Sequence, residues 1–158
     1  MKALRLCMLI LALSILVLTC EKDEPHYSVN AFESALHNNV SDYRVSEGLS
    51  PLVWNADIFV EAREQSIAWK NSGDPSTGIN ERLGIIQDHW EPENLGVITS
   101  SFNGKADTSS ARLVLEAWIA DPTIDSILVG DFVQSGAGIA EKDGTVYITH
   151  FLMKVVTK

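Results

Sequence analysis

The side chains best suited to covalent chemistry are unevenly spread along this chain. Both cysteines, Cys7 and Cys20, lie in the first twenty residues, and the folded body, from about Val29 onward, contains none. The body therefore offers no disulfide, no zinc-thiolate site and no cysteine nucleophile. Serines are plentiful, but there is no Gly-x-Ser-x-Gly elbow, and Ser135-Gly136 is better explained as the start of a strand. The sequence therefore predicts no nucleophilic triad.

Cys20 stands at the end of an N-terminal apolar segment. Lys2 and Arg5 precede an apolar run from residue 6 to residue 18, which only Ser14 interrupts. This run is shorter than the roughly 20 residues of a membrane-spanning helix and is typical of a signal peptide. Because charged residues begin directly after Cys20, the segment resembles a bacterial lipoprotein signal, in which the new N-terminal cysteine is acylated.

We therefore expect three parts: a lipoprotein signal peptide over 1–19, a tether over 20–28 that begins at the lipidated cysteine, with palmitate among its acyl chains, and one domain over 29–158. Residues 17–19 lack the usual glycine or alanine before the cysteine. An ordinary signal peptide, or an uncleaved short anchor with an incidental cysteine, is the alternative. The charged run over 21–24 looks like an export signal to the outer surface of some Gram-negative bacteria, or is a solvated tether.

Sequence signals in the body predict the helices and strands that carry these side chains. Asn30 followed by Glu33 is a capping-box pattern, and Asp143-Gly144 between two β-branched runs is a strong hairpin signal. Apolar spacing and turn formers predict helices over 30–47, 55–73, 81–87 and from 107 or 108 to 121, a helical turn over 123–129, an extended stretch over 94–99, and strands over 135–141 and 145–155.

Helices interleaved with a mainly antiparallel sheet make the chain α+β, or a layered αβα sandwich. Its 158 residues suit one domain. The net charge is −9, and it becomes −11 for residues 20–158, because Lys2 and Arg5 leave with the signal peptide and 10 basic residues then face 21 acidic ones. This acidity argues against nucleic acid as a partner, since non-specific binding to nucleic acid needs a basic surface.

Several motifs then resemble, in order, those of the CAP superfamily, which comprises cysteine-rich secretory, antigen 5 and pathogenesis-related proteins. The motifs are Tyr43-Arg44, GLSPLVWN over 48–55, PENLG over 92–96, WIADP over 118–122, Asp131-Phe132 and GAGIA over 136–140. The resemblance covers roughly residues 30–153. It implies a three-layer αβα sandwich of CAP type with a mainly antiparallel sheet.

The resemblance also implies a central cleft with two histidines and two acidic residues, a set that can bind a divalent metal. Glu93 stands at the family glutamate, and Asp121 stands where many members place the second acid. Both family histidines are absent: residues 69–73 read WKNSG, and Ile124 occupies the second position. Two carboxylates without imidazoles favour at best a weak, calcium-like oxygen site. We therefore expect no metal and no cofactor.

Two other histidines are candidates for the same cleft. His89 lies four residues before Glu93, and His150 lies in the last strand, on the same face as Ile148 and Leu152. Together with Glu93 they would rebuild a ligand set. The simpler explanations are a surface histidine in a loop for His89, a hydrogen-bonded sheet histidine for His150, and a structural role for Glu93 in holding backbone amides.

We interpret the chain as an envelope-anchored CAP-domain lipoprotein of the outer membrane, monomeric and without catalytic residues, that engages a protein, glycan or lipid. The alternative is a metal-assisted or acid/base hydrolase of peptide or cell-wall glycan that uses Glu93, Asp121 and a relocated histidine, since glycosidases need two acids flanking the scissile bond. A third possibility is an envelope protein whose acidic surface simply keeps it soluble.

Overall fold

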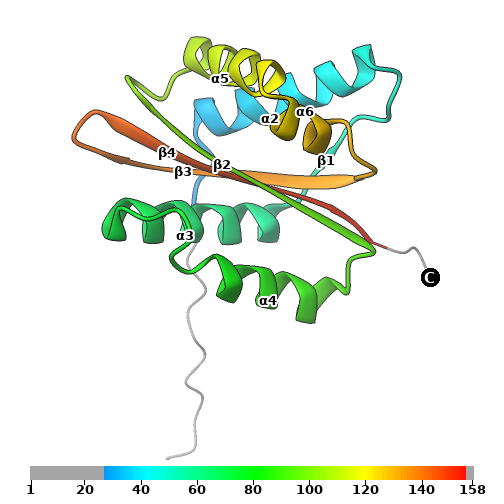
Figure 1. The fold of residues 1–158 in the computed structure, drawn as a ribbon, viewed down its shortest axis with the longest axis horizontal. Helices are drawn as coiled ribbons and strands as arrows, with labels where there is room; N and C mark the ends of the chain where they lie inside the picture. The colour runs from blue at the N-terminus through cyan, green and yellow to red at the C-terminus, as the bar shows by residue number, and fades with distance from the viewer. Residues whose placement is uncertain (1–26, 156–158) are drawn as a thin grey trace, which may run out of the picture.

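The structure is a computed structural model that describes residues 27–155. The predictions for the signal peptide and for Cys20 lie outside these residues. A four-stranded sheet lies between two layers of helices (Figure 1). Its strands, in spatial order, are β1 (Val53–Trp54), β3 (Gln134–Lys142), β4 (Thr145–Lys154) and β2 (Asn94–Asn103).

One helical layer contains α2 (Ala31–Ser46), α5 (Thr108–Ala120) and α6 (Pro122–Leu128), and the opposite layer contains α3 (Ala56–Ser72) and α4 (Ile79–Trp90) (Figure 1). The predicted α+β sandwich is therefore confirmed. The sheet is mixed rather than purely antiparallel, because β1 runs parallel to β3. Among residues 27–155, no helix is both long enough and apolar enough to cross a bilayer.

Two predicted elements are longer than their local signals indicated. The helix predicted over 81–87 runs from 79 to 90, between left-handed residues Gly78 and Glu91. The stretch predicted over 94–99 continues to Asn103, because all ten residues of β2 pair with β4 in one unbroken antiparallel register. Pairing between distant segments thus extends a strand that local sequence alone marks only in part.

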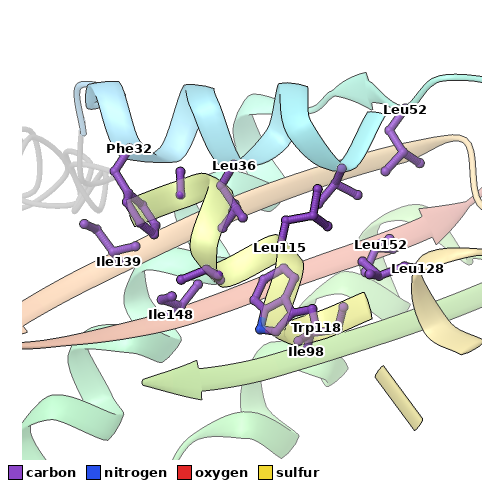
Figure 2. Close-up of a cluster of buried hydrophobic side chains, with 14 of the residues drawn as sticks. Phe32, Leu36, Leu52, Ile98, Leu115, Trp118, Leu128, Ile139, Ile148 and Leu152 are labelled. Atoms are coloured by element: carbon purple, nitrogen blue, oxygen red, sulfur yellow. The ribbon is translucent and has the colours of Figure 1, made fainter. Parts of the chain in front are cut away.

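The sheet buries hydrophobic side chains on both faces. On the α2 and α5 side, Phe32, Leu36 and Trp118 pack against Ile98 and Ile148 (Figure 2). The other face is covered by α3 and α4, whose buried residues meet alternate residues of β4; this second cluster consists of Ile58, Ala62, Ile86, Phe151 and Met153. The alternation follows from the two-residue period of a strand.

Two glycines let α3 lie directly on β3. A Cβ atom at Gly136 would come 2.3 Å from the backbone nitrogen of Phe59, and one at Gly138 would come 2.2 Å from that of Arg63. No real side chain fits at such distances. The GAGIA motif is therefore explained by close packing of a helix backbone against a strand.

Arg44 connects α2 to the segment that leads into β3. It is 2% exposed, and its guanidinium donates hydrogen bonds to the carbonyl oxygens of Leu128, Gly130 and Phe132 at 2.6, 2.8 and 3.0 Å. These bonds compensate a buried charge with backbone acceptors. The Tyr43-Arg44 motif therefore fixes the loop between α6 and the sheet.

Candidate functional site

Glu93 lies just before β2 on the protein surface. Its backbone N–H donates to the carbonyl oxygen of Lys154 at 2.8 Å, and its carboxylate lies 3.4 Å from the Lys154 ammonium. The same ammonium binds Asp131 at 2.7 Å, and this contact, with Glu93 nearby, raises the pKa of Lys154. The Glu93 carboxylate therefore already has a cation beside it.

Asp121 caps the N-terminus of α6. Its carboxylate accepts hydrogen bonds from the backbone N–H groups of Thr123 and Ile124 at 2.8 and 3.4 Å, and Pro122 occupies the first position of the helix. A carboxylate there satisfies free amides and interacts favourably with the helix dipole. These contacts give Asp121 a structural role.

His150 lies inside the domain, on the α5 side of β4. It is fully buried, and neither ring nitrogen has a hydrogen-bond partner among the described residues. Its ring stacks on that of Trp118, with the two ring centroids 6.0 Å apart. Burial, with His37 nearby, lowers the pKa of His150 to about 3. The side chain is therefore neutral, closed off from solvent and without the hydrogen bond expected of a sheet histidine.

His89 lies in the last turn of α4 rather than in a loop, because that helix is longer than predicted. Its exposed ring lies 4.2 Å from that of Trp90. Over residues 27–155, no three His, Cys, Asp or Glu side chains lie close enough together to hold a metal ion. The residues present therefore do not fit the divalent metal that the family resemblance implies.

A separate pocket lies between the start of α2 and β1, and the sequence analysis did not identify it. It has a volume of about 260 Å³ and is lined by Val29, Ser34, His37, Asn38 and Trp54. The polar residues at 34, 37 and 38 share one side of α2, because positions three and four apart are neighbours on a helix. That spacing, on a helix that otherwise buries apolar residues, is the sequence signal that could have identified the pocket.

His37 forms the most enclosed part of this pocket. It is 7% exposed, its Nδ1 lies 3.0 Å from the hydroxyl oxygen of Ser135, and its ring meets Trp54 edge-on at 5.1 Å. Burial lowers the pKa of His37. The distance suits a nucleophile and its base, but Ser135 has no exposed surface that a substrate could reach. The pair therefore connects α2 to β3.

Comparison with known proteins decides the family. Residues 37–155 match the model of the CAP, or cysteine-rich secretory protein, family. The chain belongs to the CAP family. A search of the curated proteins gave no match.

Solved structures agree with this CAP fold. An outer surface protein from Borrelia burgdorferi superposes with a TM-score of 0.66 at 14% identity, over 84% of this chain and 100% of that one. Venom allergen-like protein 4 from Schistosoma mansoni superposes with a TM-score of 0.60 at 14% identity, over 82% of this chain and 92% of that one. An extracellular SCP-domain protein from Bacillus anthracis superposes with a TM-score of 0.59 at 15% identity, over 78% of this chain and 40% of that one. At such identities the likeness shows the fold alone.

Proposed function

We propose that this CAP protein is an envelope lipoprotein whose domain binds a partner without transforming it chemically. The observation that carries the proposal is that each candidate acid or base either already binds another part of the protein or is buried. Glu93 lies against Lys154, Asp121 caps α6, and His150 is enclosed in the core. Over residues 27–155, no three His, Cys, Asp or Glu side chains gather into a cluster that could hold a metal ion.

A hydrolase would need a different arrangement. A general acid or base must reach the reacting group within hydrogen-bond distance or through one water. The buried ring of His150 meets neither condition, since both of its nitrogens are enclosed. Release of new reducing ends from cell-wall glycan, lost in a Glu93→Gln variant, would favour the hydrolase instead.

The proposed location is the cell envelope, with the domain held by acyl groups on Cys20. The solved relatives include a protein called an outer surface protein and one called extracellular, which supports this location. The eight residues from Cys20 to Tyr27 reach at most about 28 Å. On this proposal, the domain over 29–158 stays close to the bilayer. Its 9 basic and 18 acidic residues give it a charge of −9, so anionic lipids do not attract it.

Metabolic labelling with a clickable palmitate analogue tests the anchor. We expect the full-length chain, expressed in a bacterium with lipoprotein processing, to incorporate the label and the Cys20→Ala variant to lose it. Cys7→Ala is the matched control and retains the label, because Cys7 lies in the segment that is removed. Equal labelling of the Cys20→Ala variant and the wild type would contradict the proposal.

A further inference from the structure

The pocket between α2 and β1 gathers polar groups that the domain itself leaves unused. Within the described part of the chain, the hydroxyl of Ser34, the amide of Asn38 and the indole N–H of Trp54 make no hydrogen bond to another group of the protein, although all three residues line the pocket. The indole N–H of Trp118, by contrast, donates to Ser100 at 2.9 Å. The pocket therefore presents free donors and acceptors to whatever enters it.

The aromatic wall of the pocket is held in place before any ligand arrives. The centroid of the Trp54 ring lies 5.1 Å from that of the His37 ring and 5.2 Å from that of the Phe59 ring. Its backbone belongs to β1, which pairs with β3 opposite Ser135. A ring fixed in this way loses little conformational freedom on binding, which favours affinity.

The pocket lining carries no formal charge. Its five side chains are one aliphatic, one aromatic, one hydroxyl, one amide and the imidazole of His37, whose pKa burial lowers, so that the ring stays neutral. The rest of the exported chain is strongly acidic. Anionic ligands are therefore disfavoured by the overall charge, and nothing in the lining would pair with a cation.

From these observations we propose that the pocket binds one uncharged sugar ring, either as a free monosaccharide or as the end residue of a glycan. A pyranose has an apolar face of C–H groups that packs on an indole, and hydroxyls around its rim that an amide, a hydroxyl and an indole N–H can bond. The volume of about 260 Å³ suits one ring rather than a longer segment. The inference rests on the proposed role as a non-catalytic binding module, and it names the ligand class and the site.

Titration of the full-length chain tests the inference directly. The acylated protein is kept in a polyoxyethylene detergent, because alkyl glycoside detergents would themselves present sugars. Methyl glycosides of glucose, galactose and N-acetylglucosamine are added, and the indole N–H signals are followed by NMR. We expect one of the sugars to shift the Trp54 signal in a saturable way while the Trp118 signal stays in place.

Variants assign the binding to the pocket. Ser34→Ala and Asn38→Ala change exposed side chains on α2 and should each weaken binding about fivefold, the effect of one lost hydrogen bond. Trp54→Ala should abolish it. Leu113→Ala, on the exposed face of α5, is the matched control and leaves binding unchanged.

A trisaccharide of N-acetylglucosamine distinguishes the two sources of the ring. Affinity at least equal to that of the methyl glycoside indicates that the end residue of a glycan enters the pocket, and clearly weaker binding indicates a free monosaccharide; both support the inference. It is overturned if no sugar gives a saturable shift, if Asn38→Ala binds as the control does, or if phenylalanine amide binds there more tightly than any sugar. Hydrolysis of the bound trisaccharide would instead overturn the proposed function while leaving the pocket as a sugar site.

Discussion

Glu33 of α2 and Arg63 of α3 form an ion pair that joins the two helical layers across the edge of β3. The Glu33 side chain is fully buried, and one of its oxygens also accepts the backbone N–H of Ile139 at 3.0 Å. Because β1 pairs with only two residues of β3, that N–H would otherwise lie unpaired at the strand edge. The guanidinium also lies over the ring of Phe59 at 4.9 Å.

Glu33→Gln should strongly destabilise the domain. The change leaves the Arg63 charge without its partner, and breaking one side of a buried pair costs about 3–5 kcal/mol of unfolding free energy. Urea denaturation of the full-length chain measures it. Arg112→Gln, which breaks the exposed pair with Glu116 on α5, is the control and should cost less than about 0.5 kcal/mol. Similar losses in the two variants would show that Glu33 has no special role.

Gly138→Ala should prevent normal packing of α3 on the sheet. The new Cβ atom would lie 2.2 Å from the backbone nitrogen of Arg63 and 2.5 Å from the carbonyl carbon of Ala62, and neither atom belongs to a flexible side chain. We expect a large fall in Tm or an insoluble product. Gly84→Ala in α4 meets nothing within 4 Å and should stabilise the helix by about 0.5–1 kcal/mol. An unchanged Tm for Gly138→Ala would mean that the helix lies farther from β3.

His150 should make the domain sensitive to acid. Its pKa is about 3 in the folded state and 6.5 in an exposed reference, so the unfolded chain binds more protons between these values. Stability is therefore present above about pH 6.5 and is lost as the pH falls toward 3, by on the order of 4 kcal/mol. The lowered pKa of His37 acts in the same direction.

Urea titrations from pH 7 to pH 4 check this expectation. His150→Leu removes the buried imidazole and should flatten the dependence, leaving the contribution of His37. His89→Gln, at an exposed position on α4, should follow the wild-type curve. If the His150→Leu and wild-type curves keep the same slope, His150 is not the buried titrating group.

Signals carried by neighbouring residues predicted the local structure well. The capping box of Asn30 and Glu33 is present, and Gly73 ends α3 in a left-handed conformation. Asp143 and Gly144 turn between β3 and β4 with positive φ values of 52° and 77°, as an Asp-Gly hairpin requires. Each of these features depends on contacts within a few residues, which a sequence shows directly.

Contacts between distant segments could not be predicted in the same way. The motifs located Glu93 and Asp121, but not Lys154 beside the first or the capping amides beside the second. The sequence marked Glu33 as the partner of Asn30 in a capping box and gave no sign of its ion pair with Arg63. The pocket at Trp54 depends on β1 pairing with β3, a long-range contact that no local pattern encodes.

Metal analysis of the full-length chain tests the central claim that this CAP domain binds without metal-assisted catalysis. The wild type and a Glu93→Ala variant are incubated with zinc, dialysed and measured for metal content per chain. We predict the same substoichiometric zinc in both, because Glu93 lies against Lys154 and no partner ligands gather around it among residues 27–155. One zinc per wild-type chain, lost in the Glu93→Ala variant, would contradict the account.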